Sequence, residues 1–138
     1  MKVFIDANIL IYLNVPLPEE EARIIEEFWL SLVKQHELYT NALVLDETIY
    51  ISMKKYGVPP METIELIDRA VLPYVDVLSL GLEEYLLSRR FMTQYGLKPS
   101  DALHVATILA NRLDAIASED RDFNRTGIKR IWIDGEDI

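Results

Sequence analysis

The chain has 138 residues, half of them apolar, and its 14 Lys and Arg residues against 23 Asp and Glu give a net charge of −9. This length suits one domain over residues 1–138 with a sizeable core. The charge argues against general electrostatic affinity for nucleic acids or anionic membranes, and the absence of cysteine excludes disulfides, thiol nucleophiles and thiolate metal sites.

The first apolar run, FIDANILIYL at residues 4–13, contains Asp6 and Asn8. An ionised carboxylate costs several kcal/mol to bury alone, so Asp6 needs a partner, a route to water or a chemical role. The run is shorter than the roughly 18 residues of a membrane span, and Asp6 interrupts it where a signal peptide would be apolar. We therefore expect no membrane segment and a cytoplasmic location.

Hydrophobic periodicity and turn residues predict strands and helices that alternate along the chain. The expected strands cover residues 2–5, 37–40, 74–78, 115–118 and 130–133. The expected helices run from residue 7 to the prolines at 16 and 18, and over residues 19–35, 42–56, 61–72, 82–95 and 100–113, the last with Ser100 as its N-cap. This alternation predicts an α/β fold, a three-layer α/β/α sandwich with a central, mostly parallel sheet of about five strands.

Acidic residues follow two of the expected strands. Asp6 comes directly after the first, and Asp120 follows the strand at 115–118 after one residue, Glu119. In a parallel sheet both positions fall at the carboxyl ends of strands, where open α/β sheets bind ligands. Ordinary explanations also exist, because Asp6 could cap the following helix, and Asp120 and Asp122 could be solvated turn residues.

Two expected helices carry further acidic candidates in their first one or two turns. Asp101 shares a stripe with Val105 and Ile108, so its carboxylate faces the packed side, although a first-turn acid also complements the helix dipole. His104 lies near the edge of this stripe and could be structural, a substrate contact or a ligand. Asp46 and Glu47 both have apolar neighbours one turn away, so periodicity does not choose between them.

Carboxylates that meet in one cleft repel one another unless positive charge lies between them. Asp6, Asp101, Asp120 and one residue of the pair at 46–47 form such a candidate set. Oxygen ligands without cysteine select hard cations such as Mg²⁺ or Mn²⁺. Because these ions activate water and stabilise phosphate oxygens, the predicted chemistry is metal-dependent hydrolysis of phosphodiesters.

Four motifs spread over residues 4–123 give a more specific indication as an ordered set. They are FIDANIL with Asp6 and Asn8, LVLDETIY with Glu47, KPSDALHVATIL with Asp101, and IASEDRDF with Ser118, Asp120 and Asp122. This set resembles the PIN-domain ribonucleases, a family that includes the VapC-type toxins of toxin-antitoxin pairs.

The resemblance implies a function for each motif. The four metal-holding and catalytic positions would be Asp6, Glu47, Asp101 and Asp120. Ser118 would be the small hydroxyl beside the fourth acid, Asn8 would orient Asp6 or a water, and Asp122 would be an auxiliary ligand. The implied reaction is attack of metal-activated water on RNA, which leaves a 5′-phosphate and a 3′-hydroxyl. Glu119 departs from the family pattern, so the acid that touches the metal could be Glu119, Asp120 or Asp122.

The same resemblance implies partners: an RNA substrate, an antitoxin protein that covers the acidic groove, and a second copy of the chain in a homodimer. A basic rim for RNA could come from Lys54, Lys55, Arg89, Arg90, Lys98, Arg121 and Arg125. Phe28 and Trp29, on the apolar side of helix 19–35, could form a dimer face or pack into the core. The sequence does not identify the RNA that is cut.

Three competing functions are weaker. Phosphatases of the haloacid dehalogenase kind need a second aspartate two residues after the first, where this chain has Asn8. Response-regulator domains need an acidic pair after the first strand, and only Asp6 stands there. A catalytically silent PIN-like module that binds RNA or protein remains the main alternative, although the chain retains all four acids.

Overall fold

Five short apolar segments form the strands of one parallel sheet in the computed structural model, which describes residues 1–133. The strands are β1 (Lys2–Ile5), β2 (Glu37–Asn41), β3 (Val75–Leu78), β4 (Ala115–Ala117) and β5 (Lys129–Ile131). Their order across the sheet is β3-β2-β1-β4-β5, and each neighbouring pair is parallel. β1 is therefore the central strand, and its residues Val3 and Phe4 are paired with both β2 and β4.

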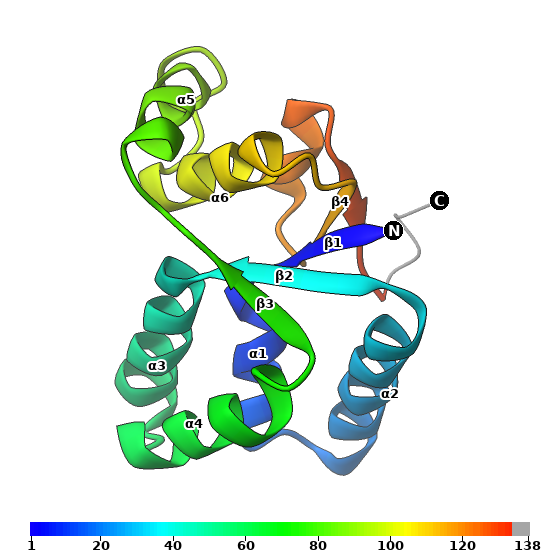
Figure 1. Ribbon diagram of the computed structural model, residues 1–138. Helices are drawn as coiled ribbons and strands as arrows, with labels where there is room; N and C mark the ends of the chain where they lie inside the picture. The colour runs from blue at the N-terminus through cyan, green and yellow to red at the C-terminus, as the bar shows by residue number, and fades with distance from the viewer. Residues whose placement is uncertain (134–138) are drawn as a thin grey trace.

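Helices cover both faces of this sheet, which confirms the expected three-layer α/β/α architecture (Figure 1). One face carries α1 (Ala7–Asn14), α2 (Glu19–Gln35), α3 (Ala42–Tyr56) and α4 (Pro60–Leu66), which continues into the π-helical turn η1 (Ile67–Val71). The other face carries α5 (Leu82–Thr93) and α6 (Pro99–Ala110). A short 3-10 helix, η2 (Arg121–Thr126), joins β4 to β5.

The direction in which successive strands are added to the sheet reverses at β1. The strands run outward from β1 to β2 and β3, and the chain then returns to place β4 on the opposite side of β1. Right-handed crossovers in opposite directions put their helices on opposite faces. At such a reversal the loops after the two strands separate, and open α/β sheets bind ligands there. Asp6 and Ser118, which follow β1 and β4, lie at this point.

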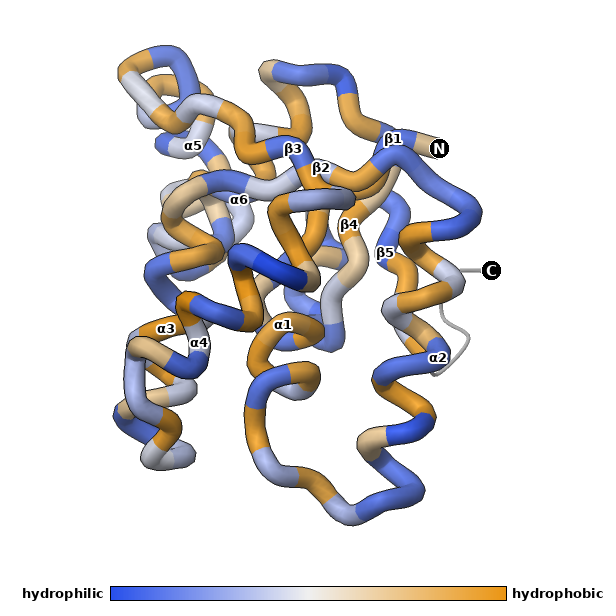
Figure 2. The backbone as a smooth tube through the Cα atoms, turned by 60° about the horizontal axis from the view of Figure 1, so that its bottom comes forward, coloured by the Kyte–Doolittle hydropathy of each residue, from blue (hydrophilic) through white to orange (hydrophobic). Residues whose placement is uncertain are grey.

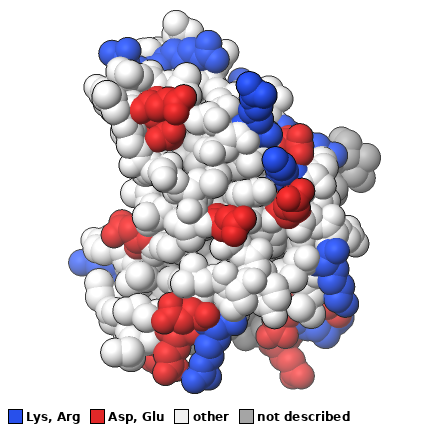
Figure 3. All heavy atoms as spheres, viewed as in Figure 1, with Lys and Arg blue, Asp and Glu red and all other residues white. Residues whose placement is uncertain are grey.

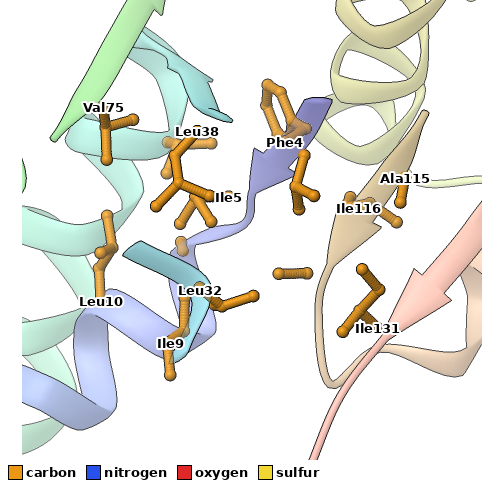
Figure 4. Packing of buried hydrophobic residues seen from close by; sticks show 14 of the residues in the cluster. Phe4, Ile5, Ile9, Leu10, Leu32, Leu38, Val75, Ala115, Ile116 and Ile131 are labelled. Carbon is orange, nitrogen blue, oxygen red and sulfur yellow. The ribbon is translucent and has the colours of Figure 1, made fainter. Parts of the chain in front are cut away.

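The core is continuous through the sheet because its central strands are buried on both faces. Val3, Phe4 and Ile5 of β1 are fully buried, and Figure 4 shows Ile5 on the side of the α1 residues Ile9 and Leu10. Phe4 contacts the opposite helical layer, where its ring centre lies 5.3 Å from that of His104. Burial of such side chains is the main stabilising contribution, roughly 1.5–3 kcal/mol for each large apolar residue.

The helices differ in how much of their surface is apolar, and Figure 2 shows this along the chain. α1 is hydrophobic over most of its length, whereas α2 alternates between hydrophobic and hydrophilic residues. α2 buries Ile25, Trp29 and Leu32, and Phe28 packs edge-on against Trp132 with ring centres 5.3 Å apart. These contacts make the aromatic side of α2 part of the packing of the described chain, not an exposed dimer face.

One predicted helix start is wrong. Ser100 does not cap α6, because the helix begins at Pro99 with Lys98 as its N-cap. The Lys98 side chain makes no capping hydrogen bond. Proline lacks an N–H and has a backbone angle suited to the first helical position, so it starts the helix ahead of Ser100. None of the helices within residues 1–133 is both long enough and apolar enough to cross a membrane.

Candidate metal centre

Asp6 is held rigidly where β1 ends and α1 begins. Its backbone N–H donates to Ala117 O at 3.1 Å, which extends the pairing of β1 with β4. One carboxylate oxygen, Oδ1, accepts from the N–H of Ala7 at 2.8 Å, so Asp6 caps α1. The other oxygen, Oδ2, accepts from Ser118 Oγ at 2.6 Å and from Asn8 Nδ2 at 3.5 Å. Asp6 therefore caps α1 and also places a buried carboxylate at the carboxyl end of β1.

Ser118 connects the Asp6 carboxylate to the segment after β4. Its hydroxyl donates to Asp6 and accepts from the N–H of Asp120 at 3.1 Å and from Asn8 Nδ2 at 3.2 Å. The carbonyl of Ser118 accepts from the buried Arg130 side chain at 2.8 Å. One buried hydroxyl therefore sets the position of Asp120 relative to Asp6.

The structure distinguishes Glu47 from Asp46, which periodicity did not. Asp46 is exposed on α3, whereas Glu47 is half-buried and faces α6. Oε1 of Glu47 lies 2.8 Å from Nε2 of His104, and the same nitrogen lies 3.9 Å from Oδ1 of Asp6. Among the described residues, Asp6, Glu47 and His104 offer donor atoms within 4.8 Å of one another.

Asp101 and Asp120 add their charges to this group. Asp101, in the first turn of α6, is only 8% exposed. Burial, followed by the charges of Asp6 and Asp120, raises the pKa of Asp101 to about 7, although His104 opposes the rise. Asp120 is half-buried and caps η2, where its Oδ1 accepts from the N–H of Asp122 at 2.9 Å.

The two other acids of the IASEDRDF motif are directed to other partners. Glu119 is exposed, and its Oε1 accepts from the hydroxyl of Tyr12 at 2.6 Å. This bond and burial raise the pKa of Tyr12, with burial the larger cause. Asp122 forms an ion pair with Arg125 at 3.3 Å. Of the three acids, Asp120 is the one whose charge acts on Asp101.

The centre has more negative than positive charge. Burial raises the pKa of Asp6, and the charge of His104 is the largest influence that lowers it. Burial lowers the pKa of His104. Its hydrogen bond to Glu47 and the charges of Asp6 and Glu47 raise that pKa by more than burial lowers it, so the net change is upward. Carboxylates forced together in this way are the oxygen donors that a divalent cation would satisfy.

Sequence reasoning missed two residues that support the centre. Asn41 caps α3 and bonds to His104 and Thr107, and Arg130 binds the carbonyl of Ser118. A polar residue between a strand and a helix could have marked Asn41 as an N-cap. No local signal identifies Arg130, because its role depends on the pairing of β4 with β5.

Two hollows lie beside Tyr12 of α1. A smaller one, of about 170 Å³, adjoins Asn8 and is lined by Asn8, Ile11, Tyr12, Ile51, Lys55 and Tyr56. A larger apolar one, of about 380 Å³, is lined by residues that include Tyr12, Leu17, Ile25, Glu119 and Trp132. Tyr12 borders both.

Comparisons with known proteins agree with this architecture. Residues 3–129 match the family model described as PIN domain. No curated protein sequence matches the chain. Among solved structures, the chain is similar to VapC20 of Mycobacterium tuberculosis, a toxin that cleaves the sarcin-ricin loop, with a TM-score of 0.74, 16% identity, and coverage of 91% of this chain and 95% of that one.

Two further solved structures share the fold. FitAcB from Neisseria gonorrhoeae has a TM-score of 0.69 and 18% identity, over 94% of this chain and 96% of that one. VapBC2 from Rickettsia felis, bound to a DNA fragment from its promoter, has a TM-score of 0.69 and 16% identity, over 96% of this chain and 98% of that one. At these identities the similarity establishes the fold.

Proposed function

The chain belongs to the PIN domain family, and on that basis we propose that it is a divalent-metal-dependent ribonuclease that hydrolyses RNA phosphodiester bonds. The observation that carries the proposal is the acidic cluster, in which Asp6, Glu47 and His104 offer ligand atoms within 4.8 Å of one another. Burial and the charges of Asp6 and Asp120 raise the pKa of Asp101 to about 7, so these groups lack sufficient positive charge between them. A divalent cation would supply it.

The donor set favours Mg²⁺ or Mn²⁺. Carboxylate oxygens suit hard cations, and the chain has no thiolate to attract softer ones. We assign the cation to Asp6, Glu47, Asp101 and Asp120, which are also the catalytic residues of the proposal. When bound, the cation would lower the pKa of a water molecule and offset negative charge on the phosphate. The proposed products are a 5′-phosphate and a 3′-hydroxyl.

The surrounding residues orient these carboxylates. Ser118 and Asn8 bind Oδ2 of Asp6, and His104 contacts Glu47 at 2.8 Å. The N–H of Asp122 holds Oδ1 of Asp120, which is the auxiliary role that we propose for Asp122. Donors held by several hydrogen bonds need little rearrangement when they bind a cation, and the geometry of the site is then reproducible.

RNA requires contacts beyond the cation. The small hollow beside Asn8 contains two aromatic rings and Lys55, whose Nζ lies 5.4 Å from the centre of the Tyr56 ring. Aromatic faces stack on bases, and a lysine binds phosphate. Figure 3 shows basic and acidic side chains interspersed, with Lys and Arg gathered at the end of the molecule where α5 lies. RNA binding should therefore be local and should weaken as salt increases.

We further propose that the protein is the cytoplasmic toxin of a toxin-antitoxin pair. The solved structures of similar fold include a toxin-antitoxin complex from Klebsiella pneumoniae, which supports an antitoxin partner. The larger apolar hollow could receive an apolar helix of that partner. A homodimer is also proposed, with the exposed side chains of Leu82, Tyr85 and Leu86 on α5 as its support.

Cleavage of labelled RNA tests the ribonuclease. Wild type, Asp6→Asn and the matched surface control Asp46→Asn are incubated with Mg²⁺, Mn²⁺ or EDTA. Asparagine also caps helices well, so Asp6→Asn should retain the start of α1. Cleavage is expected only with metal, and only from wild type and Asp46→Asn. Cleavage that persists in EDTA and in Asp6→Asn would overturn the metal assignment, and RNA binding without cleavage would favour the silent module.

A further inference from the structure

A buried chain of hydrogen bonds runs from the start of α3 through α6 to the Glu47 carboxylate. The N–H of Val44 donates to Oδ1 of Asn41 at 3.0 Å. Nδ2 of Asn41 lies 3.0 Å from Thr107 Oγ1 and 3.2 Å from Nδ1 of His104. Nε2 of His104 then lies 2.8 Å from Oε1 of Glu47. Asn41, His104 and Thr107 are completely buried, so no solvent contact competes with these bonds.

The directions of these bonds determine which nitrogen of His104 carries the proton. A backbone N–H can only donate, so the Asn41 atom that faces Val44 must be its carbonyl oxygen. The amide NH₂ then faces His104 and Thr107. The Thr107 hydroxyl donates to the carbonyl of Leu103 at 2.9 Å and therefore accepts from Asn41. The second amide hydrogen points at Nδ1 of His104, which must accept it.

His104 is therefore the tautomer that bears its hydrogen on Nε2 and donates it to Glu47. A hydrogen on Nδ1 would point at the amide hydrogen of Asn41, 3.2 Å away, so this contact opposes the second proton that the charges of Asp6 and Glu47 favour. In the other neutral tautomer, Nδ1 carries the hydrogen and Nε2 has none. Nε2 and the Glu47 oxygen would then face each other as two acceptors, with no hydrogen between them. Histidines that bind metals donate their second ring N–H to a carboxylate or carbonyl. Asn41 offers His104 a donor where a metal-binding histidine would need an acceptor.

We propose that Asn41 determines the metal selectivity of the centre, because it prevents the buried His104 from becoming a ligand and restricts the site to oxygen donors. This inference rests on the proposed metal site. Without that restriction, Asp6, Glu47 and His104 would form a mixed nitrogen and oxygen site, and imidazole suits Zn²⁺ and Ni²⁺ better than Mg²⁺. His104 is then a positioning residue that orients Glu47.

The first test is nitrogen NMR of the wild-type protein labelled with ¹⁵N at histidine. The chain has two histidines, and a His36→Gln variant assigns the signals. His104 is expected to show a protonated Nε2 and an unprotonated Nδ1 in the metal-free protein, with Mg²⁺ and with Zn²⁺. A signal from Nε2 bound to Zn²⁺, or a protonated Nδ1, would overturn the proposal without any variant.

The second test reverses the direction of the hydrogen bond between residue 41 and Nδ1 of His104. Asn41→Asp keeps an N-cap for α3 but gives Nδ1 of His104 an acceptor. Nε2 then becomes available, and Zn²⁺ should bind at least about tenfold more tightly than to wild type by calorimetry, which corresponds to about 1.4 kcal/mol. Adding His104→Gln, which removes the ring nitrogen but retains an N–H for Glu47, should return the affinity to the wild-type value.

The outcomes separate this inference from the proposed ribonuclease. Unchanged Zn²⁺ affinity in folded Asn41→Asp, with Mg²⁺ still bound by wild type, would refute the role of Asn41 and leave the metal site intact. Wild type that binds neither Mg²⁺ nor Mn²⁺ would instead refute the metal site on which the inference rests. If Asn41→Asp does not fold, as judged by circular dichroism, the NMR spectra of wild type with Zn²⁺ decide the question.

Discussion

Replacing Asp101 by asparagine should stabilise the metal-free protein while it removes one of the proposed metal ligands. The pKa of Asp101 rises from 3.8 to about 7 because its carboxylate is buried beside other acids. At about 1.4 kcal/mol for each pH unit, this rise corresponds to at most about 4 kcal/mol. Asparagine has nearly the same shape and no charge. Loss of a first-turn acid costs only about 0.3–1 kcal/mol, so the net effect of Asp101→Asn is stabilising.

The gain should depend on pH in a defined direction. Folding raises the pKa of Asp101 from 3.8 to about 7. Between about pH 4 and pH 7, Asp101 is therefore protonated in the folded protein and ionised in the unfolded chain. Stability therefore falls as pH rises through this range, and the full cost is reached above pH 7. The advantage of Asp101→Asn should be largest at pH 8 and should disappear near pH 4.

Urea unfolding in EDTA at pH 4, 6 and 8 measures these differences in stability. The proteins compared are wild type, Asp101→Asn and the exposed control Asp46→Asn. Mg²⁺ at about one thousand times its Kd should reverse the order at pH 8, because it stabilises the wild type by about 4.1 kcal/mol, which exceeds the net gain from Asp101→Asn. Asp101→Asn that is no more stable than wild type at pH 8 in EDTA would refute the electrostatic reasoning.

Three further predictions concern binding and the core. Glu47→Gln should weaken Mg²⁺ binding at least about tenfold by calorimetry, whereas Asp46→Asn should bind normally, and equal losses would contradict the orientation of α3. Mg²⁺ affinity should rise between pH 6 and pH 8, because Asp101, with a pKa of about 7, must lose its proton, and a flat profile would argue against its participation. Ile116 is fully buried in the centre of β4, so Ile116→Ala should lower the free energy of unfolding by about 2–5 kcal/mol. Leu30 is 52% exposed, so Leu30→Ala should lower it by less than about 0.5 kcal/mol. Urea titrations check this pair.

Much of the fold could be predicted because its signals are local. The periodic apolar residues of α2 and the break at Gly57, whose φ of 71° favours glycine, mark helix boundaries without tertiary information. Asp6 could be recognised for the same reason, since a carboxylate in an apolar run is unusual wherever the run packs. The start of α6 was misplaced because Pro99 and Ser100 both favour helix starts, and the proline prevailed.

The rest of the site depends on contacts between distant parts of the chain. The choice of Glu47 over Asp46 follows from the rotation of α3 against α6, which brings His104 within 2.8 Å of Glu47. Asn41 and His104 are 63 residues apart in sequence. Hydrogen-bond direction between buried side chains is a property of their packing, and a single sequence does not record it.

The position of β4 beside β1 also affects when the centre can first exist during synthesis. β1 is made first, yet its partner on one side is a strand that begins at residue 115. A growing chain folds from its amino-terminal end, so the edge of β1 beside Asp6 stays unpaired until β4 has been synthesised. Ser118 and Asp120 are synthesised only after β4. A chain released prematurely would therefore lack the centre and expose an edge that other strands could join.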